Sequence, residues 1–472
     1  MADQNKKLHI VIFPWLAFGH MIPFLELAKS IAKRGHKVSF ISTPRNINRL
    51  PKIPQNLSSL FNFVSLHLPS TDNLPENAEA TIDLPLENVQ YLKKAYDGLQ
   101  TELVHFLESS SVDWIIYDFT PHWLPSIAGK LGISRAFFCT VTAWSGVFFG
   151  SSITMMNGGD YRNKPEDFLI PPKWVPFPSK VAFRLHELRR YGTHRVHQNI
   201  SGVSDLKRFA ISVIGSDAFL IRSCLELEGD WLKILSDLHQ KPILPVGLLP
   251  STSSDCTDDQ TDDVWKTIAN WLDKHEREKV LYVALGTEVT LSQDELTELA
   301  TGLELSEVPF FWALRSVESQ TELYKLPDGF KERVKDRGMV WTNWTPQVKV
   351  LSHDSVGGFL THCGWSSVVE SLQYGKPLLM MPFLGDQGLN ARALEEKMVG
   401  LEIPRNGADG SVSRNSVAES VRLIMSYEKG NVYKEKAKEI QKIFGDRELH
   451  EKYMDQVVQY LQKQRGLSPQ NR

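Results

Sequence analysis

The sequence predicts an α/β protein with two doubly wound domains that face a cleft. Two observations predict this class. Short apolar runs of strand length alternate with helix-length amphipathic segments from the start of the chain, and the alternation begins again after a polar stretch near residue 250. A chain of 472 residues is also too long for one hydrophobic core. We therefore expect a domain over residues 1–249, a linker over 250–263, and a domain over 264–472 whose last helix packs back on the first domain.

The first domain opens with a strand–helix–strand unit. Residues 8–13 (LHIVIF) form an apolar run of strand length, and residues 37–43 (KVSFIST) form another. Between them, residues 21–34 predict a helix with an apolar face that ends at Gly35. This unit implies a right-handed crossover in a parallel sheet. Residues 114–119 and 136–141 predict further strands.

Residues 136–156 carry no charged side chain, and 21 residues are long enough to cross a bilayer. Threonine, serine and glycine interrupt this run, however, so its hydropathy is modest. We predict a buried strand followed by a helix that lines a pocket, and no membrane span. The N-terminus runs into the first strand without a cleavage site, so we expect no signal peptide.

Composition and cysteine usage limit the class of protein. A net charge of −3 argues against a nucleic-acid-binding protein. The four cysteines (139, 224, 256 and 363) are scattered without a CxxC pair, which favours reduced thiols in a cytoplasmic protein. The glycosylation sequons at Asn56 and Asn199 are then without consequence. We expect a monomer.

The second domain follows the acidic stretch PSTSSDCTDDQTDD (250–263), which we interpret as a solvated linker and not as a metal site. Residues 279–286 then predict a strand, 294–305 a helix, and 309–315 a strand. Residues 358–362 and 377–382 predict two more buried strands. The last fifty residues are charged and predict helices.

Ligands of open α/β sheets bind beyond the carboxyl ends of the strands. The residues that follow the predicted strands are therefore candidates for a site: Gly19-His20, Asp118, Gly286-Thr287 and His362-Cys363-Gly364-Trp365-Ser366-Ser367. Ser366 and Ser367 stand where a helix should begin, and we expect their hydroxyls to cap it. The backbone N–H groups and dipole of that helix form an anion site, which Gly364 lets a ligand approach and His362 supplies with a donor. A diphosphate would suit this site, although an ordinary capped helix explains the motif equally well.

Two motifs that the sequence lacks limit the kinds of reaction it could catalyse. No GxGxxG fingerprint follows a strand, which argues against a nicotinamide-dependent dehydrogenase. The chain also lacks an Asp-x-Asp pair. We therefore expect the helix N-terminus and hydrogen bonds, and no metal or other cofactor, to neutralise a bound diphosphate.

Residues 344–387 (WTPQVKVLSHDSVGGFLTHCGWSSVVESLQYGKPLLMMPFLGDQ) resemble the signature box of the plant UDP-dependent glycosyltransferases of small molecules. The order Trp-x-Pro-Gln, His-Cys-Gly-Trp, Glu and Asp-Gln matches the family pattern. FPWLAFGHMIPFLELAK (13–29) and the segment around Asp118 extend the resemblance over nearly the whole chain. The resemblance implies the GT-B fold of two Rossmann-like domains. It is strongest to the branch that glycosylates flavonoid and terpenoid compounds of plant secondary metabolism, often on a sugar already present.

The resemblance also implies roles for single residues in binding a UDP-sugar. Trp344 would stack on uracil, while Gln347 and Glu370 would bond to the ribose. His362, Ser367 and Thr287 would contact the phosphates. Trp365, Asp386 and Gln387 would hold the sugar, with Thr142 near its far hydroxyl. The donor site would also include Gly19, Gly364 and Ser366. The family usually has asparagine at 366, and the shorter Ser366 has less reach toward a phosphate.

Transfer of a sugar to an alcohol needs a base for the incoming hydroxyl. His20 is suited to this role because the pKa of histidine lies near 6.5, and Asp118 could orient it as in a hydrolase triad. A base of this kind contributes about 10²- to 10⁴-fold. Direct attack on an α-linked donor predicts a β-linked product, that is, inversion.

Four apolar residues beside these loops are candidate walls of a pocket for an apolar small-molecule acceptor: Phe18, Phe119, Trp144 and Leu384. Plain packing explains them as well. We interpret His122, His186 and His353 as structural. Gln387 favours UDP-glucose as donor, with UDP-rhamnose or UDP-xylose as alternatives. A nucleotide-sugar epimerase of similar fold and a non-enzymatic nucleotide-binding protein are the competing classes.

Overall fold

The computed structural model of the protein describes residues 7–157, 159–196, 199–251, 259–314 and 325–465. The chain forms two compact units. The first comprises Met1–Asn163, Gly192–Leu249 and Arg447–Arg472, and the second comprises Lys164–Tyr191 and Pro250–Asp446. Residues 164–191 thus belong with the second unit, although they precede residue 250 in the chain.

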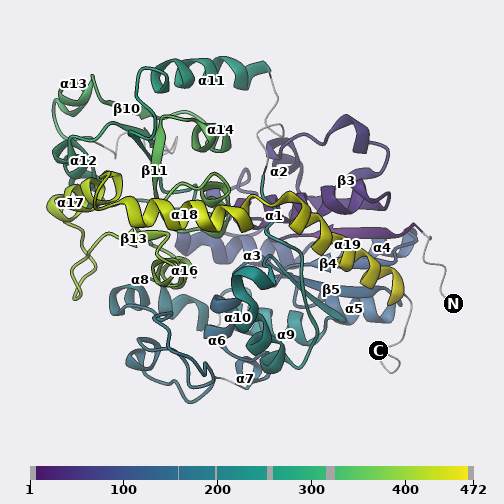
Figure 1. The fold of residues 1–472 in the computed structure, drawn as a ribbon. Helices are drawn as coiled ribbons and strands as arrows, with labels where there is room; N and C mark the ends of the chain where they lie inside the picture. The colour runs from purple at the N-terminus through teal and green to yellow at the C-terminus, as the bar shows by residue number, and fades with distance from the viewer. Residues whose placement is uncertain (1–6, 158, 197–198, 252–258, 315–324, 466–472) are drawn as a thin grey trace. The chain divides into compact units, whose positions relative to one another are not determined.

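The first unit is built on a seven-stranded parallel sheet with the order β3-β2-β1-β4-β5-β6-β7 (Figure 1). Its strands are β1 (His9–Phe13), β2 (Lys37–Ser42), β3 (Phe61–Ser65), β4 (Trp114–Tyr117), β5 (Ser134–Cys139), β6 (Ala218–Ile221) and β7 (Ile243–Pro245). Its helices are α1 (Phe18–Lys33), α2 (Pro44–Arg49), α3 (Val89–Asp97), α4 (Gln100–Ser109), α5 (Leu124–Lys130), α6 (Ala143–Phe149), α7 (Ser152–Met156), α9 (Asp205–Ile214), α10 (Leu225–His239) and α19 (Arg447–Lys463).

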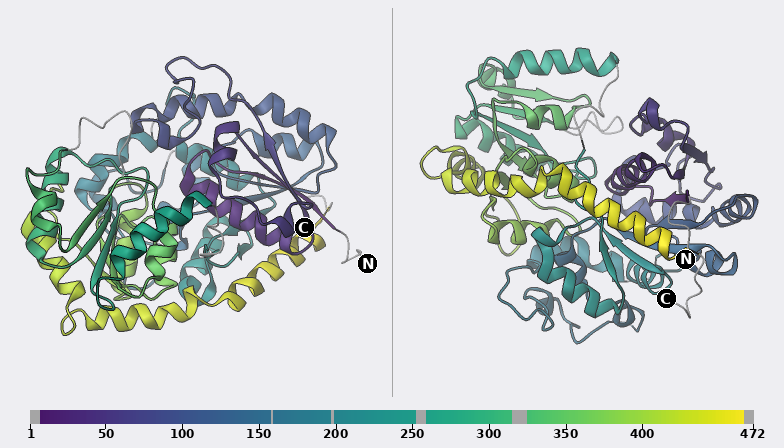
Figure 2. Two further views of the ribbon diagram at one scale, coloured as in Figure 1. Left: turned by 90° about the horizontal axis from the view of Figure 1, so that it is seen from above. Right: turned by 45° about the vertical axis from the view of Figure 1, so that its right-hand side comes forward.

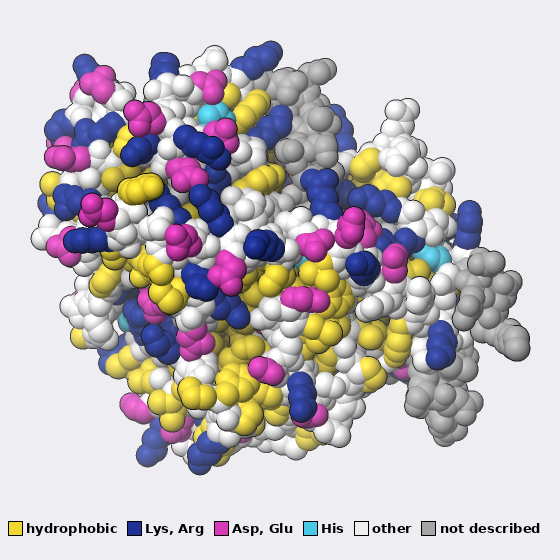
Figure 3. All heavy atoms as spheres, in the orientation of Figure 1, with side chains coloured by type: hydrophobic (Ala, Val, Ile, Leu, Met, Phe, Trp, Pro, Cys, Tyr) yellow, Lys and Arg dark blue, Asp and Glu magenta, His cyan; other side chains and the backbone are white. Residues whose placement is uncertain are grey.

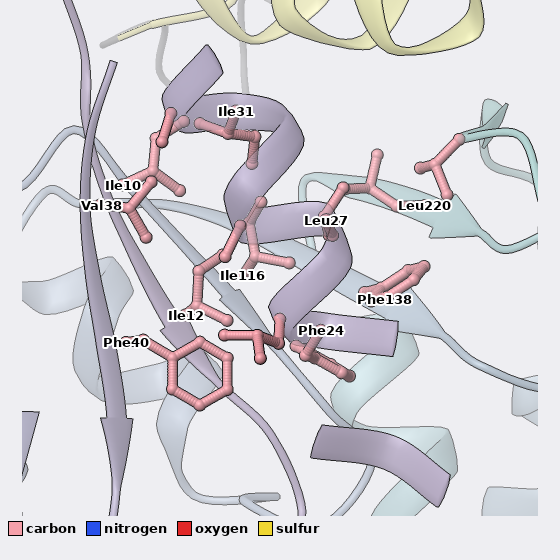
Figure 4. Packing of buried hydrophobic residues seen from close by; sticks show 14 of the residues in the cluster. Ile10, Ile12, Phe24, Leu27, Ile31, Val38, Phe40, Ile116, Phe138 and Leu220 are labelled. Atoms are coloured by element: carbon pink, nitrogen blue, oxygen red, sulfur yellow. The ribbon is translucent and has the colours of Figure 1, made fainter. Parts of the chain in front are cut away.

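The core of this unit forms where α1 packs on the sheet. The predicted apolar face of α1 is confirmed, because Phe24, Leu27 and Ile31 are completely buried against side chains of the strands (Figure 4). The strand residues in this cluster include Ile10, Ile12, Val38, Phe40, Ile116, Phe138 and Leu220. Helix α19 also belongs to this unit, since its Leu461 carbonyl accepts a hydrogen bond from the buried indole of Trp114 at 2.9 Å.

The second unit is built on a six-stranded parallel sheet with the order β10-β9-β8-β11-β12-β13, and helices flank the strands (Figure 2). Its strands are β8 (Val280–Ala284), β9 (Phe310–Ala313), β10 (Gly338–Trp341), β11 (Val356–Thr361), β12 (Leu378–Met380) and β13 (Gly400–Glu402). Its helices are α11 (Asp259–Leu272), α12 (Gln293–Ser306), α13 (Phe330–Val334), α14 (Gln347–Ser352), α15 (Trp365–Leu372), α16 (Gln387–Glu396), α17 (Arg414–Met425) and α18 (Asn431–Phe444). Helix α8 (Leu185–Val196) begins in this unit, and the chain enters the first unit after Tyr191.

Both sheets confirm the doubly wound fold, and both contain a point where the strand order reverses. In the first sheet this point lies between β1 and β4, and in the second between β8 and β11. A crevice opens beyond the carboxyl ends of two strands that diverge in this way, and ligands of α/β proteins bind there. The loops after these four strands are therefore the places to look for a site.

Several local expectations change in the structure. Helix α1 begins at Phe18 and not at residue 21, because the carbonyl of Ala17 already accepts from the backbone N–H groups of His20 and Met21. Residues 259–263, assigned to the linker, form the first turns of α11, while residues 252–258 with Cys256 lie outside the described part of the chain. The predicted strand in the uncharged stretch 136–156 belongs to β5, and two helices, α6 and α7, follow it where one was predicted. Within the described ranges, no helix is both long and apolar enough to cross a membrane.

Charged side chains of both signs are interspersed on the face shown in Figure 3. This mixture agrees with the small net charge of −3. A nucleic-acid-binding surface would instead gather its basic side chains on one face or along one helix.

Candidate active site

His20 and Asp118 meet at the reversal point of the first sheet. His20 lies in the first turn of α1, which follows β1, and Asp118 comes directly after the neighbouring strand β4. The Nδ1 atom of His20 is 2.8 Å from Oδ2 of Asp118. The Asp118 side chain is 3% exposed, whereas that of His20 is 25% exposed. The carboxylate is therefore buried behind an imidazole that solvent reaches.

The Asp118 carboxylate is held by the backbone as well. Its Oδ2 accepts from the N–H of Trp15 at 3.1 Å, and its Oδ1 accepts from the N–H of Phe119 at 2.7 Å. A carboxylate with these partners is an acceptor, so the proton shared with His20 belongs to Nδ1. The neutral imidazole then carries its basic lone pair on Nε2. An imidazole held in this way is able to act as a general base.

In the second unit, the turn after β11 holds a histidine between two glycines. A Cβ atom added to Gly286 would lie 2.6 Å from the His362 ring, and one added to Gly364 would lie 2.4 Å from its Nε2. Both contacts are too short for any residue with a side chain. Cys363, between the histidine and the second glycine, adopts a left-handed backbone with φ of 67°. Strained turns of this kind concentrate at binding sites.

Burial lowers the pKa of His362 to about 4, so its imidazole is neutral near pH 7. Its Nδ1 atom is buried and has no hydrogen-bond partner among the described residues. No hydrogen bond at Nδ1 therefore fixes the ring among the described residues. A neutral imidazole in this position can donate one N–H group to a bound anion.

The expected serine cap of the helix after this turn is wrong. Helix α15 begins at Trp365 with Gly364 as its N-cap residue, and no side chain caps it. Ser366 and Ser367 are thus the second and third residues of the helix, two and three positions after its N-cap residue. Ser367 instead accepts a hydrogen bond from the Gln347 amide at 3.2 Å. Backbone N–H groups at a helix N-terminus that no side chain caps are the kind of group that binds anions.

Gln347 and Glu370 form one connected polar group beside this helix. Nε2 of Gln347 donates to Oε2 of Glu370 at 2.7 Å, and the Tyr282 hydroxyl donates to Oε1 of Gln347 at 3.2 Å. Burial raises the pKa of Tyr282, which remains a donor. Trp344, three residues before α14, is 57% exposed and offers a free ring face for stacking. Sequence reasoning overlooked Tyr282, because nothing in a buried strand marks one tyrosine as a donor to a site.

Asp386 and Gln387 stand at the start of α16. The side-chain carbonyl of Gln387 accepts from the backbone N–H groups of Phe383 and Leu384, each at 2.9 Å, which fixes the amide so that its NH₂ group can serve as a donor. Asp386 accepts from Asn390 at 3.1 Å, and Asn390 also donates to the carbonyl of Cys363 at 3.1 Å. Asn390 was not predicted, although its position one helical turn after Asp386 is a usable signal.

Other predicted residues have structural contacts. Thr142 is completely buried and caps α6 by accepting from the N–H of Ser145 at 3.4 Å. Trp144 is also completely buried and exposes no surface to a pocket. Trp365 is buried with its ring 6.0 Å from that of Phe444. The remaining predicted residues are accessible to solvent to different degrees. Gly19 and Thr287 are exposed, and Phe18, Phe119, Ser366 and Leu384 are partly buried.

The three histidines interpreted as structural have protein partners or are enclosed. His122 is 3.1 Å from Arg208, His353 is 3.2 Å from Asp273, and His186 is buried against Gly410. Among the described residues, no three His, Cys, Asp or Glu side chains gather closely enough to hold a metal ion.

Comparisons with known proteins identify the family of the chain. Residues 209–462 match the family of UDP-glucoronosyl and UDP-glucosyl transferases. UDP-glycosyltransferase 91D2 of Stevia rebaudiana is 50% identical over 98% of this chain and 96% of its own length. Soyasaponin III rhamnosyltransferase of Glycine max is 41% identical over 98% of this chain and 97% of its own length. The solved structure of Phytolacca americana UGT2, complexed with UDP-2fluoro-glucose and pterostilbene, has a TM-score of 0.72 and 25% identity and covers 96% of this chain and 99% of that one.

Two Rossmann-like units, each a parallel sheet flanked by helices, form the architecture of the GT-B glycosyltransferases. The chain belongs to the plant family 1 UDP-glycosyltransferases, enzymes that glycosylate small molecules. Membership of a transferase family argues against the epimerase alternative.

Proposed function

We propose that the protein transfers glucose from UDP-glucose to a hydroxyl group of a flavonoid or terpenoid glycoside, with inversion and without a metal ion. The observation that carries the proposal is the pair of His20 and Asp118 at 2.8 Å, next to a solvent-accessible edge of the imidazole. The donor would occupy the group of residues around His362, Glu370 and Gln387.

The reaction would proceed as one displacement. The acceptor oxygen attacks the anomeric carbon, the bond from that carbon to the diphosphate oxygen breaks, and the hydroxyl proton passes to Nε2 of His20. Asp118 stabilises the imidazolium that forms. UDP leaves with its charge near the N-terminus of α15 and the N–H group of His362.

Glucose as the sugar is supported by the polar groups at the start of α16. Asp386 supplies an acceptor and the Gln387 NH₂ group supplies a donor, which together pair with neighbouring sugar hydroxyls. A relative that is 41% identical is named a rhamnosyltransferase, so UDP-rhamnose is the second candidate donor. The same relative is named for a saponin acceptor, which supports an acceptor that already carries a sugar.

The test is transfer by the purified protein in EDTA, with UDP-glucose, UDP-rhamnose and UDP-xylose each offered to flavonoid and terpenoid glycosides. Product mass identifies the sugar, and proton coupling constants identify the anomeric configuration. We expect a β-glucoside, and we expect Gln387→His to weaken the use of UDP-glucose. A native preference for UDP-rhamnose would overturn the donor assignment, an α-linked product would overturn inversion, and a requirement for added Mg²⁺ would overturn the metal-free site.

A further inference from the structure

Residues 179–190 come from the middle of the chain, yet they pack along α16 in the second unit. We call this segment the brace. The Ser179 hydroxyl donates to Glu396 at 3.2 Å, and the backbone N–H of Lys180 donates to the same carboxylate. These contacts lie at the last residue of α16. Glu187 of the brace lies at the first turn of α16, so the brace follows this helix over its length.

Buried ion pairs fasten the brace to α16 and to β13. Glu187 pairs with Arg392, and Nη1 of Arg392 is 3.3 Å from Oε2 of Glu402. Arg184 pairs with the same Glu402 oxygen at 2.9 Å. The side chains of Glu187, Arg392 and Glu402 are each at most 8% exposed. Because buried charges are costly when a partner is removed, these groups hold each other in one arrangement.

The brace touches the first turn of α16 directly. A Cβ atom added to Gly388 would lie 2.4 Å from Oε1 of Glu187. Gly388 follows Gln387, the residue whose NH₂ group is proposed to bind the sugar. The Glu187 carboxylate therefore rests on the backbone that carries the sugar-binding pair.

The brace also reaches the loop before Asp386. The guanidinium of Arg190 lies 5.2 Å from the centre of the Phe383 ring, and that of Arg405 lies 4.8 Å from it. Phe383 supplies one of the two N–H groups that orient the Gln387 side chain. Cationic groups over an aromatic ring restrain its position. The brace thus contacts residues on both sides of Asp386 and Gln387.

We propose that the brace is part of the donor-sugar subsite, and that Glu187 and Arg392 are positioning residues that set the sugar preference by orienting Asp386 and Gln387. This inference rests on the proposed function. A carboxylate and an amide discriminate between sugars only when they are held within a fraction of an ångström of the hydroxyl groups. The uracil and ribose groups lie elsewhere, on Trp344, Gln347 and Glu370, so the brace should affect the sugar and not the nucleotide.

The experiment compares the affinities for UDP, UDP-glucose and UDP-galactose by calorimetry. Glu187→Gln keeps the side-chain volume, removes the charge, and leaves Arg392 with Glu402. We expect the ratio of affinity for UDP-glucose to that for UDP-galactose to fall about tenfold, while the affinity for UDP stays within about twofold. Arg414→Gln is the matched control, because Arg414 forms an exposed ion pair with Glu298 in the same unit at 2.5 Å. It should leave all three affinities unchanged.

A second variant keeps the test valid if Glu187→Gln fails to fold. Arg190→Gln changes a side chain that is 38% exposed, and it removes the contact with Phe383 and the ion pair with Glu295. It should reduce the same ratio. Folded variants that keep the native ratio would overturn the inference, as would a loss of UDP affinity equal to the loss of UDP-glucose affinity. A native protein that binds UDP and every UDP-sugar equally would overturn the proposed function, and the inference with it.

Discussion

Replacing Asp118 by asparagine should disable His20 by changing which nitrogen carries the proton. Oδ2 of Asp118 lies 2.8 Å from Nδ1 of His20 and 3.1 Å from the N–H of Trp15, while Oδ1 lies 2.7 Å from the N–H of Phe119. All three contacts need an acceptor. An asparagine NH₂ group turned toward His20 would force Nδ1 to accept and would place the proton on Nε2. Turned the other way, it would face the N–H of Phe119.

The magnitude follows from these contacts. A hydrogen bond to a charged group contributes about 1.5–3 kcal/mol, which corresponds to about 10- to 150-fold in rate. The wrong tautomer also removes the base, whose contribution is about 10²- to 10⁴-fold. We therefore expect Asp118→Asn to lower kcat by about 10²-fold or more, and His20→Ala to do the same. UDP affinity should stay nearly unchanged, because the residues proposed to hold UDP belong to the second unit.

Single-turnover measurements with UDP-glucose and an alcohol acceptor test this coupling. The double variant should be little worse than His20→Ala alone, since a base that is absent cannot be misaligned. Thr140→Val is the control: its hydroxyl is 3.3 Å from Nδ1 of His20, and its loss should cost about 2- to 10-fold, well below the loss expected for Asp118→Asn. Losses that multiply in the double variant would refute the dyad. Near-normal turnover of His20→Ala would refute His20 as the base.

Two other perturbations have definite outcomes. Trp344→Ala should weaken UDP binding about tenfold by calorimetry, as expected for loss of one base stack, whereas Tyr427→Ala, at a residue 83% exposed in the same unit, should not. His362 should make the protein less stable as the pH is lowered. Its pKa is about 4 in the folded protein and 6.5 in the unfolded chain, so the unfolded chain binds a proton first. A stability of about 3 kcal/mol, fully present above pH 6.5, is therefore lost as the pH falls toward 4. The Tm of His362→Gln should then fall less than that of the native protein between pH 7 and pH 5, and equal slopes would contradict the assignment.

The residues that follow the ends of strands could be predicted from the sequence. His20 and Asp118 each follow a recognisable apolar run, and the strand order of a doubly wound sheet, which reverses beside its first strand, brings β1 and β4 together. The start of α15 was misplaced because two serines look like caps in a sequence, whereas the glycine before the helix already has the extended N-cap backbone, with φ of −61° and ψ of 133°. Only coordinates reveal that this glycine also makes room for the ring of His362.

Two other features left no local signal. Glu187 and Arg392 are 205 residues apart, so no pattern within either segment predicts their pairing or the place of residues 164–191 in the second unit. The tryptophans of the signature box look alike in the sequence, but Trp344 is 57% exposed and Trp365 only 5%. Short strands such as β13, with three residues, fall below the length at which periodicity is visible.

Each sheet has a histidine beside its reversal point, and the two histidines have opposite surroundings. His20 and His362 both follow a strand that borders a reversal of strand order. His20 lies against a buried carboxylate, which fixes its tautomer and stabilises the charged form that a base must reach. His362 lies between two glycines with its Nδ1 unpartnered among the described residues, and burial lowers its pKa to about 4. It therefore stays neutral and can donate to a phosphate without becoming a competing base. In the proposed reaction, neighbouring groups, and not the type of residue, would assign one histidine to proton transfer and the other to anion binding.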